Sequence, residues 1–162
     1  MSAPARQLPE AAALFNPAFG AYVQAHCVAA HTAAGPSLPL PLPSSFLVLP
    51  LVLPPASRAA LPRDVRTPLA SWLADNPIQR ASYPHRAASL TDYTRASQRF
   101  GVLHNVLTVH SSGLAVTRQP RRPNANSHGA ELVDCTRAAA LVGRWLAATS
   151  PATAFALLGV RP

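Results

Sequence analysis

The sequence predicts a mainly α-helical chain with one small β-hairpin, arranged as a winged-helix-like helical domain with C-terminal helices. Three observations support this fold class. A capping side chain precedes a proline, a common helix start, at Asn16-Pro17 and at Ser150-Pro151. Apolar residues recur every three or four positions in residues 91–107. The period then changes to that of strands around Ser111-Ser112-Gly113, which is typical of a hairpin turn.

The first predicted helix begins at Asn16-Pro17 and ends near Ala34, before Gly35-Pro36. A proline-rich apolar segment, residues 36–56, follows this helix. Within that segment, residues 37–43 are expected to be an extended connector. Residues 46–53 (FLVLPLVL) have no polar face and are expected in the core, but their pattern fits a short helix as well as a strand.

Three further helical pieces are predicted before the amphipathic region. Ser57 is expected to cap a short helix that ends at Leu61, and Thr67-Pro68 repeats the cap-plus-proline signal. Leu69, Trp72 and Leu73 then form one apolar face. Residues 78–88 are expected to be helical with a break at Pro84.

Residues from Thr91 onward form the clearest amphipathic pattern in the sequence. Thr91 is the predicted cap, and the side chains expected to face inward are Tyr93, Ala96, Phe100, Leu103 and Leu107. Residues 106–117 are the predicted hairpin. Helices followed by a hairpin is the element order of a winged-helix module.

The predicted organisation has three parts. Residues 1–117 form the winged-helix-like core, and residues 118–130 form a basic, mobile loop rich in turn residues. Residues 131–162 form C-terminal helices that pack on the core, because Leu132, Cys135, Val142, Trp145 and Leu146 share one helical face.

The composition favours a protein that binds other macromolecules. Hydrophobic residues make up 49% of the chain and charged residues only 12%, with a net charge of +8 carried by Arg alone. So few charges favour an apolar surface covered by another chain, although an Ala- and Pro-rich composition from a GC-rich genome is an alternative. The two cysteines make no CxxC motif and no signal peptide is visible, so a cytoplasmic location is expected. Six prolines in residues 38–56 argue against a membrane span there.

Catalytic motifs are absent from the sequence. The seven glycines are scattered, so no phosphate-binding loop exists, and the six acidic residues form no convincing pair. Cys27 and His31, one helical turn apart, could join His26, Cys135 and His128 around a metal ion. A buried cysteine is more often a small hydrophobic residue, so no metal and no cofactor are expected.

Two groups of arginines are candidates for nucleic-acid contact. Arg118, Arg121 and Arg122 follow the hairpin, where the wing of a winged helix could touch a phosphate backbone. Arg95 and Arg99 lie one turn apart and could extend that surface. A solvated face and a disordered loop are the alternative explanation for these residues.

Five strings, in order, resemble the middle component of bacterial three-component ABC systems. They are residues 14–19 (LFNPAF), 46–53, 61–67 (LP followed by RT), 72–77 (WLADNP) and 159–162 (GVRP). The resemblance implies a small non-catalytic subunit that acts with an ABC or SMC-like ATPase and a third, variable component. Such systems are thought to defend bacteria against phage, plasmids or other invading DNA, and related SMC-type accessory subunits are built on winged helices.

The same resemblance implies partner-binding roles for Phe15, Asn16, Pro17, Phe19, Phe46, Leu49, Trp72 and Arg161. Helix caps, core packing and a helix stop also explain most of these residues. Arg161 is the exception, because no packing requirement specifies residues 159–162. The resemblance is uninformative for residues 31–45 and 124–127.

The sequence therefore predicts an adaptor that bridges an ABC or SMC-like ATPase to an effector protein from the same operon, with any DNA contact indirect and no membrane association. Two alternatives stay open. One is a stand-alone winged-helix DNA-binding regulator that uses residues 93–107 as its recognition helix. The other is a small enzyme that uses the Cys/His cluster.

Overall fold

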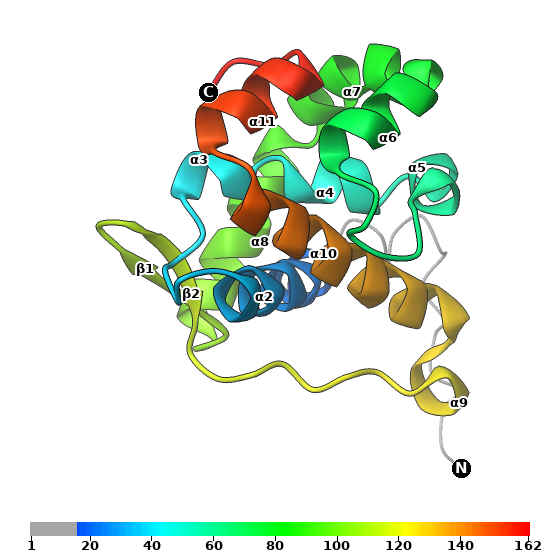
Figure 1. Ribbon diagram of the computed structural model, residues 1–162. Helices are drawn as coiled ribbons and strands as arrows, with labels where there is room; N and C mark the ends of the chain where they lie inside the picture. The colour runs from blue at the N-terminus through cyan, green and yellow to red at the C-terminus, as the bar shows by residue number, and fades with distance from the viewer. Residues whose placement is uncertain (1–15) are drawn as a thin grey trace.

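The computed structural model describes residues 16–162 (Figure 1). Two strands, β1 (Leu107–His110) and β2 (Gly113–Val116), pair antiparallel. Most of the other described residues are helical, which confirms the predicted fold class of mainly α with a small β-hairpin. In chain order the helices are α2 (Pro17–Ala34), α3 (Leu42–Ser45), α4 (Val48–Val52), α5 (Pro55–Ala60), α6 (Leu69–Asp75), α7 (Pro77–Ser89), α8 (Thr91–Leu103), α9 (Ala125–His128), α10 (Ala130–Ala148) and α11 (Pro151–Leu158).

Helix α2 is the central helix of the fold. α10 runs alongside it and α8 packs against another side (Figure 1). Because neighbours surround α2, nearly every residue between Gly20 and His31 is buried. Its start is as predicted: the Asn16 side chain accepts a hydrogen bond from the Ala18 backbone N–H at 2.9 Å, and Pro17 is the first helical residue.

Glycines allow both neighbours to approach α2 closely. A Cβ added to Gly143 of α10 would lie 2.2 Å from the Cys27 carbonyl oxygen. A Cβ added to Gly20 would lie 2.1 Å from the Ser97 hydroxyl oxygen of α8. Both distances are shorter than any van der Waals contact, so a larger residue at either position would push the helices apart.

The sequence pattern of residues 46–53 fitted either a helix or a strand. The structure has helix α4 there, and all five residues of α4 are buried. Pro50 is the third residue of the helix, where the missing N–H has no intrahelical acceptor to lose. The predicted connector is shorter than expected, since α3 already begins at Leu42. α5 begins at Pro55, whose fixed φ suits the first turn, so the prediction that Ser57 caps this helix is wrong.

The predicted hairpin is confirmed, and the proline-rich segment adds to it. Leu40 and Leu114 exchange two backbone hydrogen bonds, of 2.8 and 2.7 Å. Leu40 lies between two prolines, which have no backbone N–H to donate. Leu40 is therefore the residue of this stretch that can donate a backbone hydrogen bond to β2. Gly113 permits this approach, because a Cβ would lie 2.0 Å from the Leu40 carbonyl oxygen.

Helices α7 and α8 differ from the prediction in three ways. α7 runs through Pro84 without ending, since the neighbouring Tyr83 is fully buried and its hydroxyl donates to the Leu47 carbonyl at 2.9 Å. Thr91 is not a cap but the first residue of α8, and its hydroxyl donates to the Ala87 carbonyl at 3.0 Å. α8 also turns small residues toward α2, so Leu103, expected inside, is 79% exposed.

Residues 118–130, predicted to be a loop, contain the short helix α9. The Asn124 side chain accepts a hydrogen bond from the Asn126 N–H at 2.9 Å and begins it. The predicted final helix α11 is present, with the Ser150 hydroxyl accepting from the Thr153 N–H at 3.3 Å. Within residues 16–162 no single helix is both long and apolar enough to cross a membrane.

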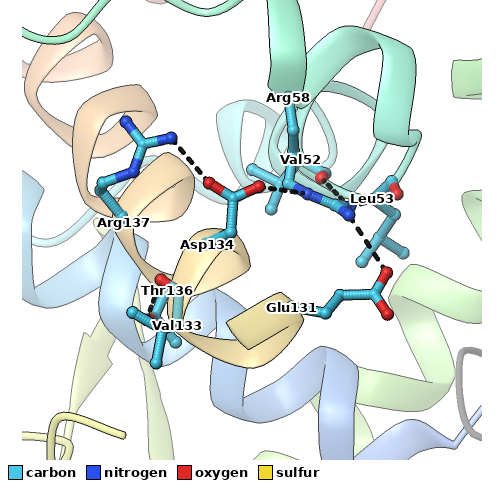
Figure 2. Close-up of polar contacts among 8 residues, drawn as sticks. All are labelled: Val52, Leu53, Arg58, Glu131, Val133, Asp134, Thr136 and Arg137. Atoms are coloured by element: carbon cyan, nitrogen blue, oxygen red, sulfur yellow. Dashed lines mark hydrogen bonds and ion pairs between the residues drawn. The ribbon is translucent and has the colours of Figure 1, made fainter. Parts of the chain in front are cut away.

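A buried arginine joins α4 and α5 to α10 (Figure 2). The Arg58 side chain is 6% exposed and donates to the carbonyl oxygens of Val52 and Leu53 at 3.0 and 2.6 Å. It also pairs with Glu131 at 3.1 Å and with Asp134 at 3.0 Å. Burial raises the pKa of Asp134, but hydrogen bonds from Arg137 and Arg58 outweigh it and hold that pKa below its usual range.

The buried histidines of α2 predict a fall in stability on acidification. Burial lowers the pKa of both His26 and His31, whereas an unfolded histidine has a pKa of about 6.5. As the pH falls below that value the unfolded chain binds protons first, so the free energy of unfolding decreases. In a phosphate-free buffer we expect a lower melting temperature at about pH 5.5 than at about pH 7.5. The double substitution His26→Gln with His31→Gln should flatten this dependence, and an equally steep dependence in that variant would refute the explanation.

Candidate functional site

An apolar groove with a volume of 540 Å³ lies between α3, α7, α11 and residues 159–162. Thr91, Arg95 and Arg161 are its polar lining residues. The other side chains that line it are mostly apolar: Leu42, Pro43, Phe46, Leu47, Pro84, Ala87, Ala88, Phe155, Val160 and Pro162. A concave apolar surface with a few cationic groups is suited to binding an amphipathic segment.

The end of α11 explains why Arg161 lies at this groove. Gly159 ends the helix with a φ of 69°, in the left-handed region that favours glycine. The Val160 N–H then donates to the Phe155 carbonyl at 3.1 Å. This turn reverses the direction of the chain, so Val160 packs against the core while Arg161 stays exposed.

A second hollow, with a volume of 430 Å³, adjoins the groove and shares Leu42 and Arg95 with it. It lies where the C-terminal half of α8 meets the hairpin, and its other lining residues are Gln98, Arg99, Val102, Leu103 and Val109. Four apolar side chains are exposed there, namely Leu42 (40%), Val102 (40%), Leu103 (79%) and Val109 (55%). We call the groove and this hollow together the apolar face.

The charged side chains that line the apolar face are all positive. No acidic side chain lines either hollow, whereas Arg95, Arg99 and Arg161 all do. Arg95 makes an exposed ion pair with Asp92 at 3.2 Å, and Arg99 and Arg161 form no ion pair with any residue from 16 to 162. Exposed apolar side chains bordered by unpaired charges are typical of a protein–protein interface.

A sequence model of the ABC-three component (ABC-3C) system Middle Component 3 matches residues 5–162. The match covers almost the whole chain. The chain belongs to this middle-component family. No curated protein and no solved structure matches it, so the winged-helix relationship stays a prediction.

Two of the residues expected to bind a partner meet in the groove of this middle component. Phe46 and Arg161 are far apart in sequence, and both line it. Arg95, expected at a nucleic-acid surface, lines the groove as well. The partner-binding roles of Phe46 and Arg161 therefore remain a coherent proposal, because both side chains are accessible at one place.

The other residues expected to bind a partner lie in the core or at the start of α2. Leu49 is fully buried, and Trp72 is 2% exposed with its indole N–H donating to the Ala60 carbonyl at 2.7 Å, so neither side chain is at the surface. Asn16 and Pro17 begin α2, and Phe19 is partly buried against the core. Phe15 lies outside the described residues.

The arginines expected to contact nucleic acid do not line one common hollow. Arg95 and Arg99 line the apolar face. Arg118, Arg121 and Arg122 are exposed on the segment before α9, and Arg122 lines a different hollow that shares no residue with that face. A DNA surface built from both groups is therefore not apparent in the middle component.

Three residues of the apolar face were missed or misassigned from the sequence. Leu42 was placed in an extended connector, and Val109 was taken only as a strand residue. Leu103 was expected in the core because it continues the spacing of Tyr93 and Phe100. A run of small residues at Thr94, Ser97 and Gly101 was the available signal that α8 turns a different face inward.

The Cys/His cluster does not assemble in the described part of the middle component. Cys27 and Cys135 are both fully buried, and burial raises the pKa of the Cys27 thiol strongly and that of Cys135 to about 11. His128 is exposed on α9. Among residues 16–162 no three His, Cys, Asp or Glu side chains lie close enough to hold a metal ion.

Proposed function

We propose that this middle component is a non-catalytic adaptor that joins the ATPase of its system to an effector in the bacterial cytoplasm, in defence against invading DNA. Membership of the middle-component family supports an adaptor role. The observation that carries the proposal is the apolar face, on which Leu103 is 79% exposed in the same hollow as Arg99, which has no ion-pair partner among residues 16–162. A lone soluble domain seldom keeps such a surface uncovered.

The proposed occupant of the apolar face is an acidic, amphipathic segment of the ATPase component. Apolar side chains of that segment would enter the groove beside Phe46 and cover Leu103. Its carboxylates would pair with Arg99 and Arg161, which lack ion-pair partners among the described residues. Arginine forms two parallel hydrogen bonds with a carboxylate, which suits a largely dry interface.

The adaptor role is tested by co-expressing the chain with the ATPase and the effector encoded beside it. We expect the effector to co-purify with a tagged ATPase when the chain is present and to be lost when the chain is omitted. Direct binding of effector to ATPase without the chain would contradict the adaptor role. DNA binding by the chain, with no association with either neighbour, would support a stand-alone regulator instead.

The substitution Leu103→Asp tests whether the apolar face is the contact surface. Since it places a carboxylate in a predicted apolar, basic interface, we expect the Kd for the ATPase component to rise about 30-fold. Ile78→Asp is the matched control, because Ile78 is 78% exposed but lines neither hollow. Binding to the control should stay within about twofold of the original. Equal effects of the two substitutions would place the interface elsewhere.

A further inference from the structure

A third hollow lies between α2, α10 and residues 118–124, which pass along α2 toward α9 (Figure 1). It has a volume of 330 Å³ and shares no residue with the apolar face. The polar side chains that line it come from all three parts: His26, Arg122, Thr136, Arg137 and Arg144. We call it the basic cleft.

Three arginines line the basic cleft, and no acidic residue does. Arg137 pairs with Asp134 at 2.7 Å. Arg122 and Arg144 make no ion pair with any residue that the structure describes. The cleft therefore carries a surplus of positive charge and unused hydrogen-bond donors, which is the chemistry of an anion site.

A buried histidine also lines the basic cleft. His26 is only 9% exposed, and its Nε2 has no hydrogen-bond partner among the described residues. Buried polar atoms in native proteins nearly always have a partner, so this nitrogen keeps an unused hydrogen-bonding capacity beside the cleft.

Backbone contacts hold Arg122 in position. The Tyr22 hydroxyl donates a hydrogen bond to the Arg121 carbonyl oxygen. The His26 ring packs edge-on against the Tyr22 ring, with 4.7 Å between the two ring centroids. The segment is thus fixed to α2 at the residue before Arg122, so the arginine faces the cleft from an ordered backbone.

We propose that the basic cleft binds a backbone phosphate of a nucleic-acid strand. The forked guanidinium groups of Arg122 and Arg144 match phosphate oxygens. Arg118 and Arg121 are exposed on the same segment, outside the cleft, where they extend the positive surface along a strand. This extension favours a polynucleotide over a single free anion.

The test is fluorescence anisotropy of the full chain with a labelled oligothymidylate at low salt. In the double variant Arg122→Ala with Arg144→Ala we expect about a tenfold weaker affinity. The slope of log affinity against log salt should also fall by about 0.7, the value for one phosphate of a single strand. The control is the double variant Arg63→Ala with Arg80→Ala, which removes the same charge from exposed residues outside the cleft. It should lose much less affinity.

Three results would overturn the proposal. An equal loss in the control variant would mean that net charge alone binds the strand. Displacement of the oligonucleotide by ATP at equal phosphate concentration would indicate a site for free phosphates, and displacement by polyglutamate would indicate a carboxylate site. A second measurement does not depend on variants: the His26 imidazole resonances should shift when the oligonucleotide is added, and unchanged resonances would exclude the cleft.

DNA binding and partner binding are separable in this scheme. The variant Leu103→Asp should bind the oligonucleotide with the original affinity, because the apolar face and the basic cleft share no residue. Loss of oligonucleotide binding in a folded Leu103→Asp variant would argue against a strand bound in the cleft alone.

Discussion

The substitution Arg58→Ala is expected to lower the free energy of unfolding by about 3 kcal/mol. It would leave the carbonyl oxygens of Val52 and Leu53 without their donor in the core. It would also remove the ion pairs that attach α10 to α5 through Glu131 and Asp134 (Figure 2). Chemical denaturation, followed by circular dichroism, measures this loss.

Two further variants show whether the buried geometry is the cause. Arg66→Ala removes an exposed ion pair with Asp64 and should change stability little. Arg58→Lys keeps the positive charge, but an ammonium group has too few donors in the right geometry for all four acceptors. It should therefore recover only part of the lost stability. If Arg58→Lys were as stable as the original chain, charge rather than hydrogen-bond geometry would be responsible.

The substitution Gly143→Ala is expected to destabilise the protein by about 2–3 kcal/mol. The new methyl group would lie 2.2 Å from the Cys27 carbonyl oxygen, which belongs to the backbone of the central helix and cannot rotate away. The two longest helices, α2 and α10, would have to separate. The better helix propensity of alanine, about 1 kcal/mol, offsets only part of this cost.

Gly35→Ala is the control for Gly143→Ala. Gly35 has a negative φ, and a Cβ there would lie 3.6 Å from the His31 carbonyl oxygen, an ordinary contact. Its melting temperature should therefore stay close to the original. Similar losses in both variants would mean that glycine flexibility, and not the α2–α10 contact, limits stability.

Helices and strands whose ends are marked by residues close by in the sequence were predictable. Asn16-Pro17 begins α2 and Ser150-Pro151 begins α11, because a capping side chain and a fixed φ act within one turn. The hairpin was predictable for the same reason, since Gly113 follows the two-residue turn and has a positive φ. Signals of this kind do not depend on the rest of the fold.

Features that depend on tertiary contacts were not predictable. α7 continues through Pro84 because Tyr83 is anchored to Leu47, a residue distant in sequence. Leu103 faces solvent because α8 needs small residues against α2. Tertiary packing outweighs the helix-breaking tendency of proline in the first case and apolar periodicity in the second.

Single residues of the candidate site could be identified from the sequence, but their arrangement in space could not. Phe46 and Arg161 were identified from short strings, yet nothing local in either string shows that the two side chains meet in one groove. The basic cleft depends on His26, Arg122 and Arg144, which come from three separated parts of the chain. Their meeting follows only from how α2, α10 and residues 118–124 pack.

The proposal that the apolar face binds the ATPase component is tested most directly by hydrogen exchange. The backbone amides of the chain are compared alone and in complex with that component. We expect new protection at the end of α8, at β1 and around residues 159–161, and none at the start of α7, where the control residue Ile78 lies. Protection confined to other surfaces, with the amides near Leu103 unchanged, would contradict the proposed interface.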